Sequence, residues 1–262
     1  MLEYLKYLAI CAVLAALIMS VLTILRRAFP HKLGEQTQQV AGYVAAFVAT
    51  IYAFILGFSI MVLWQMHDTA ESTVSKEVND LRTMYRLAKA SPDPEKLSGE
   101  IIEYLKCVRD EEWKDMAQGH ISKRAEQLKE QIWLRTITLV NMYKSEGTIA
   151  AALLDSFIQF NTNRQARIGM IDGRLHPLLL IALMAGGVFT ITSFYFLSIK
   201  NSAGRLILDA ALIGTILINL YLVYALNKPF SGTQSAVSSK AFSRGLEAIY
   251  LFEEEERSIK KQ

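Results

Sequence analysis

The residues with the clearest chemical pattern lie in and just after the second long apolar stretch of the sequence. Read at alternating steps of three and four, this stretch places large apolar side chains and one hydroxyl on a single helical face, namely Phe47, Thr50, Phe54, Phe58 and Met61. The same spacing continues to the acidic residues Asp68 and Glu71. Such a face predicts either a pore neck that excludes water, with acids that attract cations at its mouth, or a surface for helix packing.

Motifs for catalysis are missing from the sequence. It contains no His-Glu-x-x-His, Gly-x-Ser-x-Gly, Walker or Cys-x-x-Cys pattern. His67 with Asp68 and Glu71 could form a weak metal site on one helix face, but the pattern better suits the solvated surface of a helix that leaves a membrane. We therefore predict that the protein is not an enzyme and uses no metal or other cofactor.

Four long stretches of the sequence are almost free of charge. Residues 7–25, 40–64 and 177–199 carry none, and residues 206–226 carry only Asp209. A bilayer core of about 30 Å needs about 20 apolar helical residues, so each stretch is long enough to span it. The first stretch lacks the basic start and the small-residue cleavage site of a signal peptide, which predicts a retained span. Asp209 has Arg205 four residues earlier, and we expect the two to pair near the membrane surface.

The polar segment between the second and third spans predicts helices. No Pro or Gly occurs from Gln65 to Ala90, and acidic and basic residues alternate in nearly equal numbers up to His176. This mixture is typical of solvated helix faces and argues against nucleic-acid binding. The predicted fold is all-α: a polytopic membrane protein with four transmembrane helices and an inserted helical domain. We expect transmembrane helices 1 and 2 in residues 1–64, the domain in 65–176, helices 3 and 4 in 177–228, and a tail with an amphipathic helix in 229–262.

Apolar residues recur at helical spacing through this domain and the tail. We expect Asp93 and Pro94 to begin a helix. The expected buried positions are Leu97, Ile101, Tyr104, Leu105 and Val108, then Ala125, Leu128, Ile132, Leu139 and Met142, and in the tail Phe242, Leu246, Ile249 and Tyr250.

Lys and Arg near the span ends suggest an orientation. More of them flank the domain side than the two short loops, which favours a cytoplasmic location for the domain and for both termini. The expected location is the bacterial inner membrane.

Several short motifs carry a family resemblance. Glu77-Val78-Asn79-Asp80-Leu81 and Met84-Tyr85-Arg86-Leu87 follow the second span, and Tyr104 with Glu111-Glu112-Trp113 lies further on. Arg174-Leu175-His176-Pro177 leads into the third span, and Pro229-Phe230-Ser231-Gly232 follows the fourth. This pattern resembles the bestrophin-like group of bacterial and plant membrane proteins. The motif residues are Glu77, Arg86, Trp113, Pro177, Pro229, Phe230 and Gly232, and Asn227 stands where members of the group commonly have Asp.

The resemblance implies distant kinship with bestrophins, which are pentameric ion channels with four spans per subunit and a large helical cytosolic domain. The leading hypothesis is a homo-oligomeric, cation-preferring ion channel lined by the second span. Its partners would be further copies of the chain, with five suggested by the bestrophins, together with membrane lipids and inorganic ions but no nucleic acid. The alternative is a non-conducting membrane scaffold or sensor whose helical domain binds a partner.

Overall fold

The protein is helical, as its sequence predicts. A computed structural model describes residues 2–28, 34–91, 94–142, 147–172, 175–195, 197, 202–231 and 236–259, and contains no strand within them. Its elements are α1 (Leu2–Ala28), α2 (Glu35–Lys89), α3 (Pro94–Cys107), the π-helical turn η1 (Val108–Glu112), α4 (Trp113–Ala117), α5 (Lys123–Met142), α6 (Gly147–Ile168), α7 (Pro177–Tyr195), α8 (Ser202–Asn227) and α9 (Lys240–Ile259).

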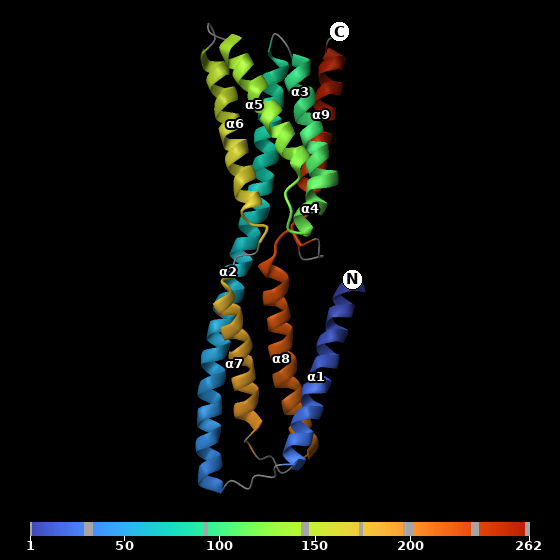
Figure 1. The fold of residues 1–262 in the computed structure, drawn as a ribbon. Helices are drawn as coiled ribbons and strands as arrows, with labels where there is room; N and C mark the ends of the chain where they lie inside the picture. Colours follow the sequence, from blue (N-terminus) through green and yellow to red (C-terminus); the bar gives the residue numbers. More distant parts are fainter. Residues whose placement is uncertain are drawn as a thin grey trace. The chain divides into compact units, whose positions relative to one another are not determined.

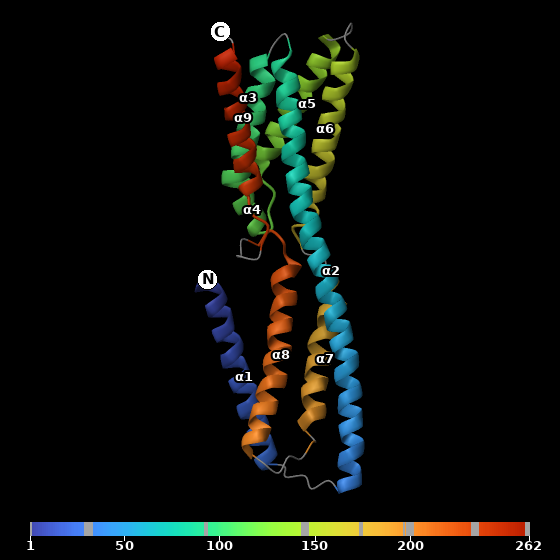
Figure 2. The ribbon, with the colours of Figure 1, turned by 180° about the vertical axis from the view of Figure 1, so that it is seen from behind.

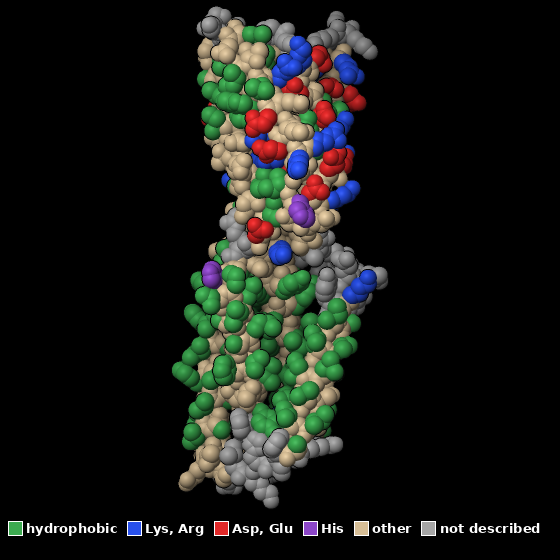
Figure 3. Space-filling view, in the orientation of Figure 1, with side chains coloured by type: hydrophobic (Ala, Val, Ile, Leu, Met, Phe, Trp, Pro, Cys, Tyr) green, Lys and Arg blue, Asp and Glu red, His purple; other side chains and the backbone are tan. Residues whose placement is uncertain are grey.

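The chain forms two compact units. The span unit comprises Met1–Gln65 and Arg174–Asn227, and the helical unit comprises Met66–Gly173 and Lys228–Gln262. α1, α2, α7 and α8 are each long and apolar enough to cross a membrane. Apolar side chains cover the helices of the span unit, whereas Lys, Arg, Asp and Glu are spread over the helical unit (Figure 3). The four predicted spans are therefore all present as helices.

Within the span unit, α1 and α7 both pack against α8 (Figures 1 and 2). α7 begins at Pro177, whose missing N–H costs nothing in the first turn. His176 caps this end, since its Nδ1 accepts the Leu178 N–H at 3.2 Å and its carbonyl accepts the Leu179 N–H at 2.8 Å. The Asn227 side chain accepts the Leu175 N–H at 2.9 Å, so this amide joins the end of α8 to the approach to α7.

The α2 helix packs on α7 through one aromatic ring and two glycines. A Cβ on Gly186 would lie 2.7 Å from Tyr52 Cδ2, and one on Gly187 would lie 3.2 Å from the Tyr52 hydroxyl. These distances leave no room for a side chain, so the glycine pair permits the close approach of the two helices. The buried face of this part of α2 comprises Ala45, Tyr52, Leu56, Ser59 and Leu63.

The helical unit has one continuous apolar core. Its buried members include Val74, Leu81, Met84, Ile132, Leu153, Phe160 and Phe242. Pro94 begins α3 as predicted, whereas Asp93 lies outside the described residues. Every position predicted to be buried in α3 and η1 is buried, but two predictions further along are wrong. Met142 is 61% exposed at the last turn of α5, and Tyr250 is 41% exposed because it lies one residue beyond the buried stripe of α9.

The contact between α2 and α9 also depends on a glycine. A Cβ on Gly245 would lie 2.5 Å from Val78 Cγ1. α9 therefore lies directly on α2 within the helical unit, and its Phe242, Leu246 and Ile249 enter the shared core.

Candidate functional site

The predicted pore face of α2 is exposed at each of its residues in the span unit. Phe47 is 67% exposed, Phe54 77%, Phe58 59% and Met61 52%, and Thr50 is exposed with its hydroxyl donating to the Ala46 carbonyl at 2.8 Å. The opposite face carries the buried residues of this part of α2, among them Tyr52 and Leu56. In this part of α2 one face is therefore fixed by packing, and a face of large apolar side chains is left uncovered.

The two predicted acids are also exposed. Asp68 and Glu71 lie in the part of α2 that belongs to the helical unit, where Ala70 and Val74 face the core. Within the residues that the structure describes, no group of three His, Cys, Asp or Glu side chains is gathered for a metal ion.

The helical unit encloses a cluster of charged side chains, which we call the buried charge network: Glu77, Tyr104, Glu112, Arg164 and Arg167. All five have essentially no exposed surface. Arg167 donates from Nε to Glu77 Oε2 at 2.6 Å and from Nη2 to Glu77 Oε1 at 3.0 Å. The same Nη2 lies 2.8 Å from Glu112 Oε2, and Arg164 Nη2 lies 2.9 Å from Glu112 Oε1. Two arginines and two glutamates therefore balance their charges inside the core.

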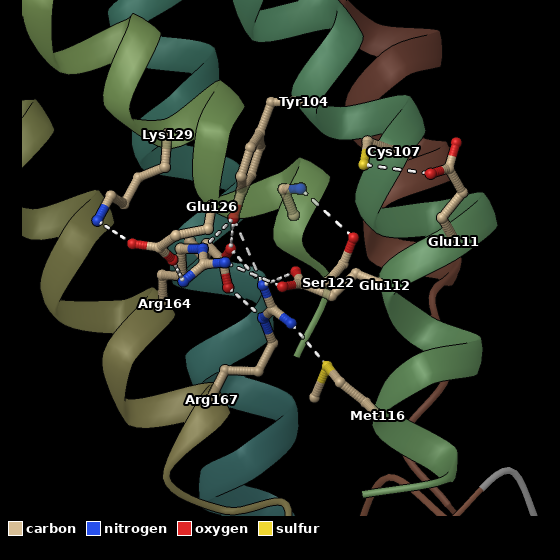
Figure 4. A network of polar contacts seen from close by, with 12 residues as sticks. Tyr104, Cys107, Glu111, Glu112, Met116, Ser122, Glu126, Lys129, Arg164 and Arg167 are labelled. Carbon is tan, nitrogen blue, oxygen red and sulfur yellow. Dashed lines mark hydrogen bonds and ion pairs between the residues drawn. The ribbon is translucent and has the colours of Figure 1, made fainter. Parts of the chain in front are cut away.

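A tyrosine and a methionine complete the network. The Tyr104 hydroxyl donates to Glu77 Oε1 at 2.8 Å and accepts from Arg164 Nε at 3.0 Å. Arg167 Nη1 contacts Met116 Sδ at 2.8 Å. Figure 4 shows both arginines reaching from α6 toward Tyr104 and Glu112. Each of the five network side chains thus has a charged or polar partner, which is the condition for burying ions.

The π-helical turn η1 supplies Glu112 to the network. A π turn holds one residue more than an α turn, and such turns often occur at functional positions. Here the wider turn ends at Glu112, which is fully buried, while its neighbour Glu111 stays on the surface and bonds Arg124 at 2.7 Å. Trp113 follows, with its ring edge-on to Phe230 at 5.5 Å between centroids.

Burial and neighbouring charges shift the pKa values of two network members, Tyr104 and Arg167. Burial, and then the Glu77 carboxylate, raise the pKa of Tyr104 well above its ordinary value, so the phenol stays protonated. Burial alone would lower the pKa of Arg167, but Glu77 and Glu112 outweigh it and raise that pKa. Arg167 is therefore a permanent cation in this core.

The motif residues divide between the two units. Glu77 is a member of the buried charge network. Trp113 lies next to the network residue Glu112, and its ring packs edge-on against the buried Phe230. Arg86 is exposed, with its guanidinium 5.5 Å from the centre of the Phe252 ring. Pro177 is exposed at the start of α7, Pro229 is buried and accepts the Val237 N–H at 2.8 Å, and Gly232 lies outside the described residues.

The predicted pairing of Asp209 with Arg205 is wrong. Asp209 instead bonds the guanidinium of Arg26 from α1. Arg205 turns the other way, and its Nη2 donates to the carbonyls of Leu197 at 2.7 Å and Tyr195 at 3.3 Å. The end of α7 has carbonyls with no partner inside the helix, and they attract the Arg205 guanidinium away from its neighbour on α8.

The sequence reasoning did not identify the two network arginines. Arg164 and Arg167 are three residues apart on α6, on the same face as the buried Leu153, Phe157 and Phe160. Two arginines in an apolar helical face indicate buried carboxylate partners, and Glu77 likewise interrupts the apolar face of α2. This pattern was available in the sequence.

Comparison with known proteins agrees with this architecture. The sequence matches the Bestrophin-like domain over residues 12–242. Among solved structures, a variant of a bacterial bestrophin homologue from Klebsiella pneumoniae is similar, with a TM-score of 0.66, 12% identity, and coverage of 93% of this chain and 96% of that one. The same homologue in another crystal structure has a TM-score of 0.65 and 11% identity, with coverage of 93% of this chain and 96% of that one. A chain described as a membrane protein has a TM-score of 0.67 and 12% identity, with coverage of 91% of this chain and 95% of that one. No curated protein matches. With a family match that extends over most of its length, the chain belongs to the bestrophin-like family of membrane proteins.

Proposed function

We propose that the protein is a homo-oligomeric ion channel whose pore is lined by α2. The observation that carries this proposal is the uncovered face of Phe47, Phe54, Phe58 and Met61, which ends in exposed acids on the same unbroken helix. Exposed apolar side chains also cover α7, where Phe189 is 68% exposed, and contact with lipid accounts for them. The continuation into Asp68 distinguishes α2 from these lipid-facing surfaces.

One α2 face per chain cannot enclose a path, so conduction needs several copies around an axis. A closed ring with rotational symmetry places the same face of each copy toward the centre. The bestrophins suggest five copies. In such a ring Phe54 and Phe58 would form stacked apolar collars, which restrict ions by excluding their water.

Helix geometry distinguishes the two acids. An ideal α-helix advances about 100° per residue, so Asp68 lies about 40° from the direction of Phe54 and Glu71 about 100° away. Asp68 is therefore the stronger candidate for a ring of charge at the pore mouth. A ring of like charges in a narrow mouth concentrates the opposite ion, and this supports cation preference.

We further propose that residues 65–176 form a cytoplasmic helical domain between the span pairs 1–64 and 177–228, with residues 229–262 as the tail. Both chain ends then lie in the cytoplasm, and the bilayer is the bacterial inner membrane. The excess of Lys and Arg on the domain side supports this orientation.

The alternative function is a non-conducting scaffold or sensor, and one observation favours it. On the helical unit, Leu134 of α5 and Ile158 of α6 are 64% and 50% exposed, and such side chains suit a protein partner. A partner surface on this unit is compatible with either function, so ion flux decides between them.

The test is ion flux through purified protein in liposomes under KCl and NaCl gradients. Wild type should conduct, and Phe54→Ala and Phe58→Ala should each raise conductance because a wider neck holds water. Phe189→Ala, which removes an equally exposed ring from α7, is the matched control and should leave conductance unchanged. The masses of all four proteins in mild detergent should match the same oligomer. A monomer, or a wild type without flux in either gradient, would exclude the channel.

A further inference from the structure

The start of α8 carries an excess of positive charge inside the span unit. Arg26 and Arg205 contribute two guanidinium groups, and Asp209 is the carboxylate beside them. Asp209 forms an ion pair with Arg26, whose guanidinium also lies 5.4 Å from the centre of the Tyr195 ring. Arg205 lies within electrostatic reach of Asp209, but its printed hydrogen bonds run from Nη2 to two carbonyls. Among the side chains that the structure describes here, two guanidinium groups therefore face one carboxylate, which leaves one positive charge in excess.

Two N–H groups of this cluster also lack an acceptor. The Nε atoms of Arg26 and Arg205 are shielded from solvent and have no hydrogen-bond partner among the residues that the structure describes. A buried donor without an acceptor is unfavourable, and in native proteins a bound ion or water is one explanation for it. The missing partner has to accept hydrogen bonds and carry negative charge.

A cavity of about 430 Å³ opens beside this cluster, between the end of α7 and α8. Arg205 and Asp209 form part of its wall, and Phe194, Leu208, Ala211 and Leu212 form much of the rest. Its volume falls in the range of roughly 300–1,000 Å³ that is usual for ligand sites. The site thus offers a guanidinium on one part of its wall and an apolar channel along a membrane-spanning helix on the other.

We propose that this cavity binds an anionic phospholipid. Its phosphate accepts hydrogen bonds from Arg205 and neutralises the excess charge, and one acyl chain lies along α8 against Leu208 and Leu212. The planar guanidinium group of arginine presents several N–H donors in a geometry that matches phosphate oxygens. A free phosphate would satisfy the charge and leave the apolar wall empty, which is why the lipid fits better. The site is independent of whether the protein conducts ions.

The experiment is native mass spectrometry of the detergent-purified protein titrated with phosphatidylglycerol, phosphatidylcholine or inorganic phosphate. Wild type should retain phosphatidylglycerol over phosphatidylcholine. Arg205→Gln should lower the apparent affinity for phosphatidylglycerol about tenfold, as expected for the loss of charge-assisted hydrogen bonds. Arg244→Gln makes the same change of charge on an exposed position of α9 and should retain the lipid like wild type.

A second variant separates lipid binding from the capping of α7 by Arg205. Ala211→Phe leaves both arginines in place and fills the apolar wall, so it should also weaken phosphatidylglycerol binding while the protein keeps its thermal stability. Equal retention of phosphatidylcholine, unchanged binding in either cavity variant, or inorganic phosphate that competes as well as the lipid would each overturn the proposal.

Discussion

Arg167 and Glu77, ninety residues apart in the sequence, form a two-point ion pair with no exposed surface on either side chain. The pair joins α6 to α2 and holds α6 in one register, because a shift along either helix would separate two charges in a medium that solvates them poorly. This contact therefore specifies how the helical unit assembles.

The first prediction concerns this pair. Arg167→Met should destabilise the protein by about 3–5 kcal/mol, because it leaves Glu77 and part of Glu112 charged and unpaired in the core. Arg124→Gln is the control: Arg124 is 54% exposed and bonds two surface glutamates, so its loss should leave the stability nearly unchanged. Thermal unfolding in detergent measures both. Adding Glu77→Gln to Arg167→Met should recover part of the loss, and a further drop instead would show that charge is not the cause.

The second prediction concerns the α2–α7 contact. Gly186→Ala places a methyl 2.7 Å from a Tyr52 ring carbon and should cost about 1–3 kcal/mol through overpacking. Gly214→Ala on α8 has nothing within 4 Å of the new methyl, and should be neutral or stabilising by up to about 1 kcal/mol. Comparing their melting temperatures tests the geometry. Similar losses in both would mean that Tyr52 does not pack on Gly186.

The third prediction uses the buried thiol of Cys107. Burial, followed by the nearby Glu111 carboxylate, raises the pKa of Cys107 from 9.0 to about 11. Below pH 9 the thiol is protonated in both the folded and the unfolded chain, so its contribution to stability is complete. Between pH 9 and 11 only the unfolded chain ionises, and that contribution is lost. Wild type should therefore lose about 1–2 kcal/mol more than Cys107→Ala over this interval in unfolding experiments. Parallel pH profiles would contradict the shift.

The fourth prediction concerns selectivity. Asp68→Asn should move the reversal potential under a KCl gradient toward zero, whereas Glu71→Gln should change it less because it is turned further from the predicted axis. Asp155→Asn removes an exposed carboxylate from α6 and serves as the control. A wild type that prefers anions, or one whose potential ignores Asp68→Asn, would show that this acid is ordinary solvated surface.

The helices of this protein could be predicted from local patterns. Span length, the proline at position 94 and the buried face of α3 each depend on a few neighbouring residues, so the sequence is sufficient for them. Contacts between distant segments behave differently. Asp209 had a plausible partner four residues away, but the folded chain offers it Arg26, about 180 residues distant. The spacing of residues along one helix cannot show whether Asp209 will bind Arg205 or Arg26.

The candidate site shows the same division. The α2 stripe is a local pattern that the sequence alone identifies, and its assignment to a pore or to a packing surface stays a prediction. The buried charge network needs three segments to meet, and only the presence of charges in apolar faces could have signalled it. Neither the π turn at Val108–Glu112 nor its effect on Glu112 has a recognisable sequence signature here.

The η1 turn has a consequence for chain length in related proteins. One residue more than an α-helical turn is absorbed between Val108 and Glu112, so α4 continues with Trp113 and Met116 directed at the core. Without that accommodation, one added residue would rotate everything downstream by about 100°. A relative shorter by one residue at this turn should therefore keep the same downstream faces in an ordinary α-helix. A single-residue gap at this point in an alignment would therefore mark a relative in which an ordinary α-helical turn replaces η1.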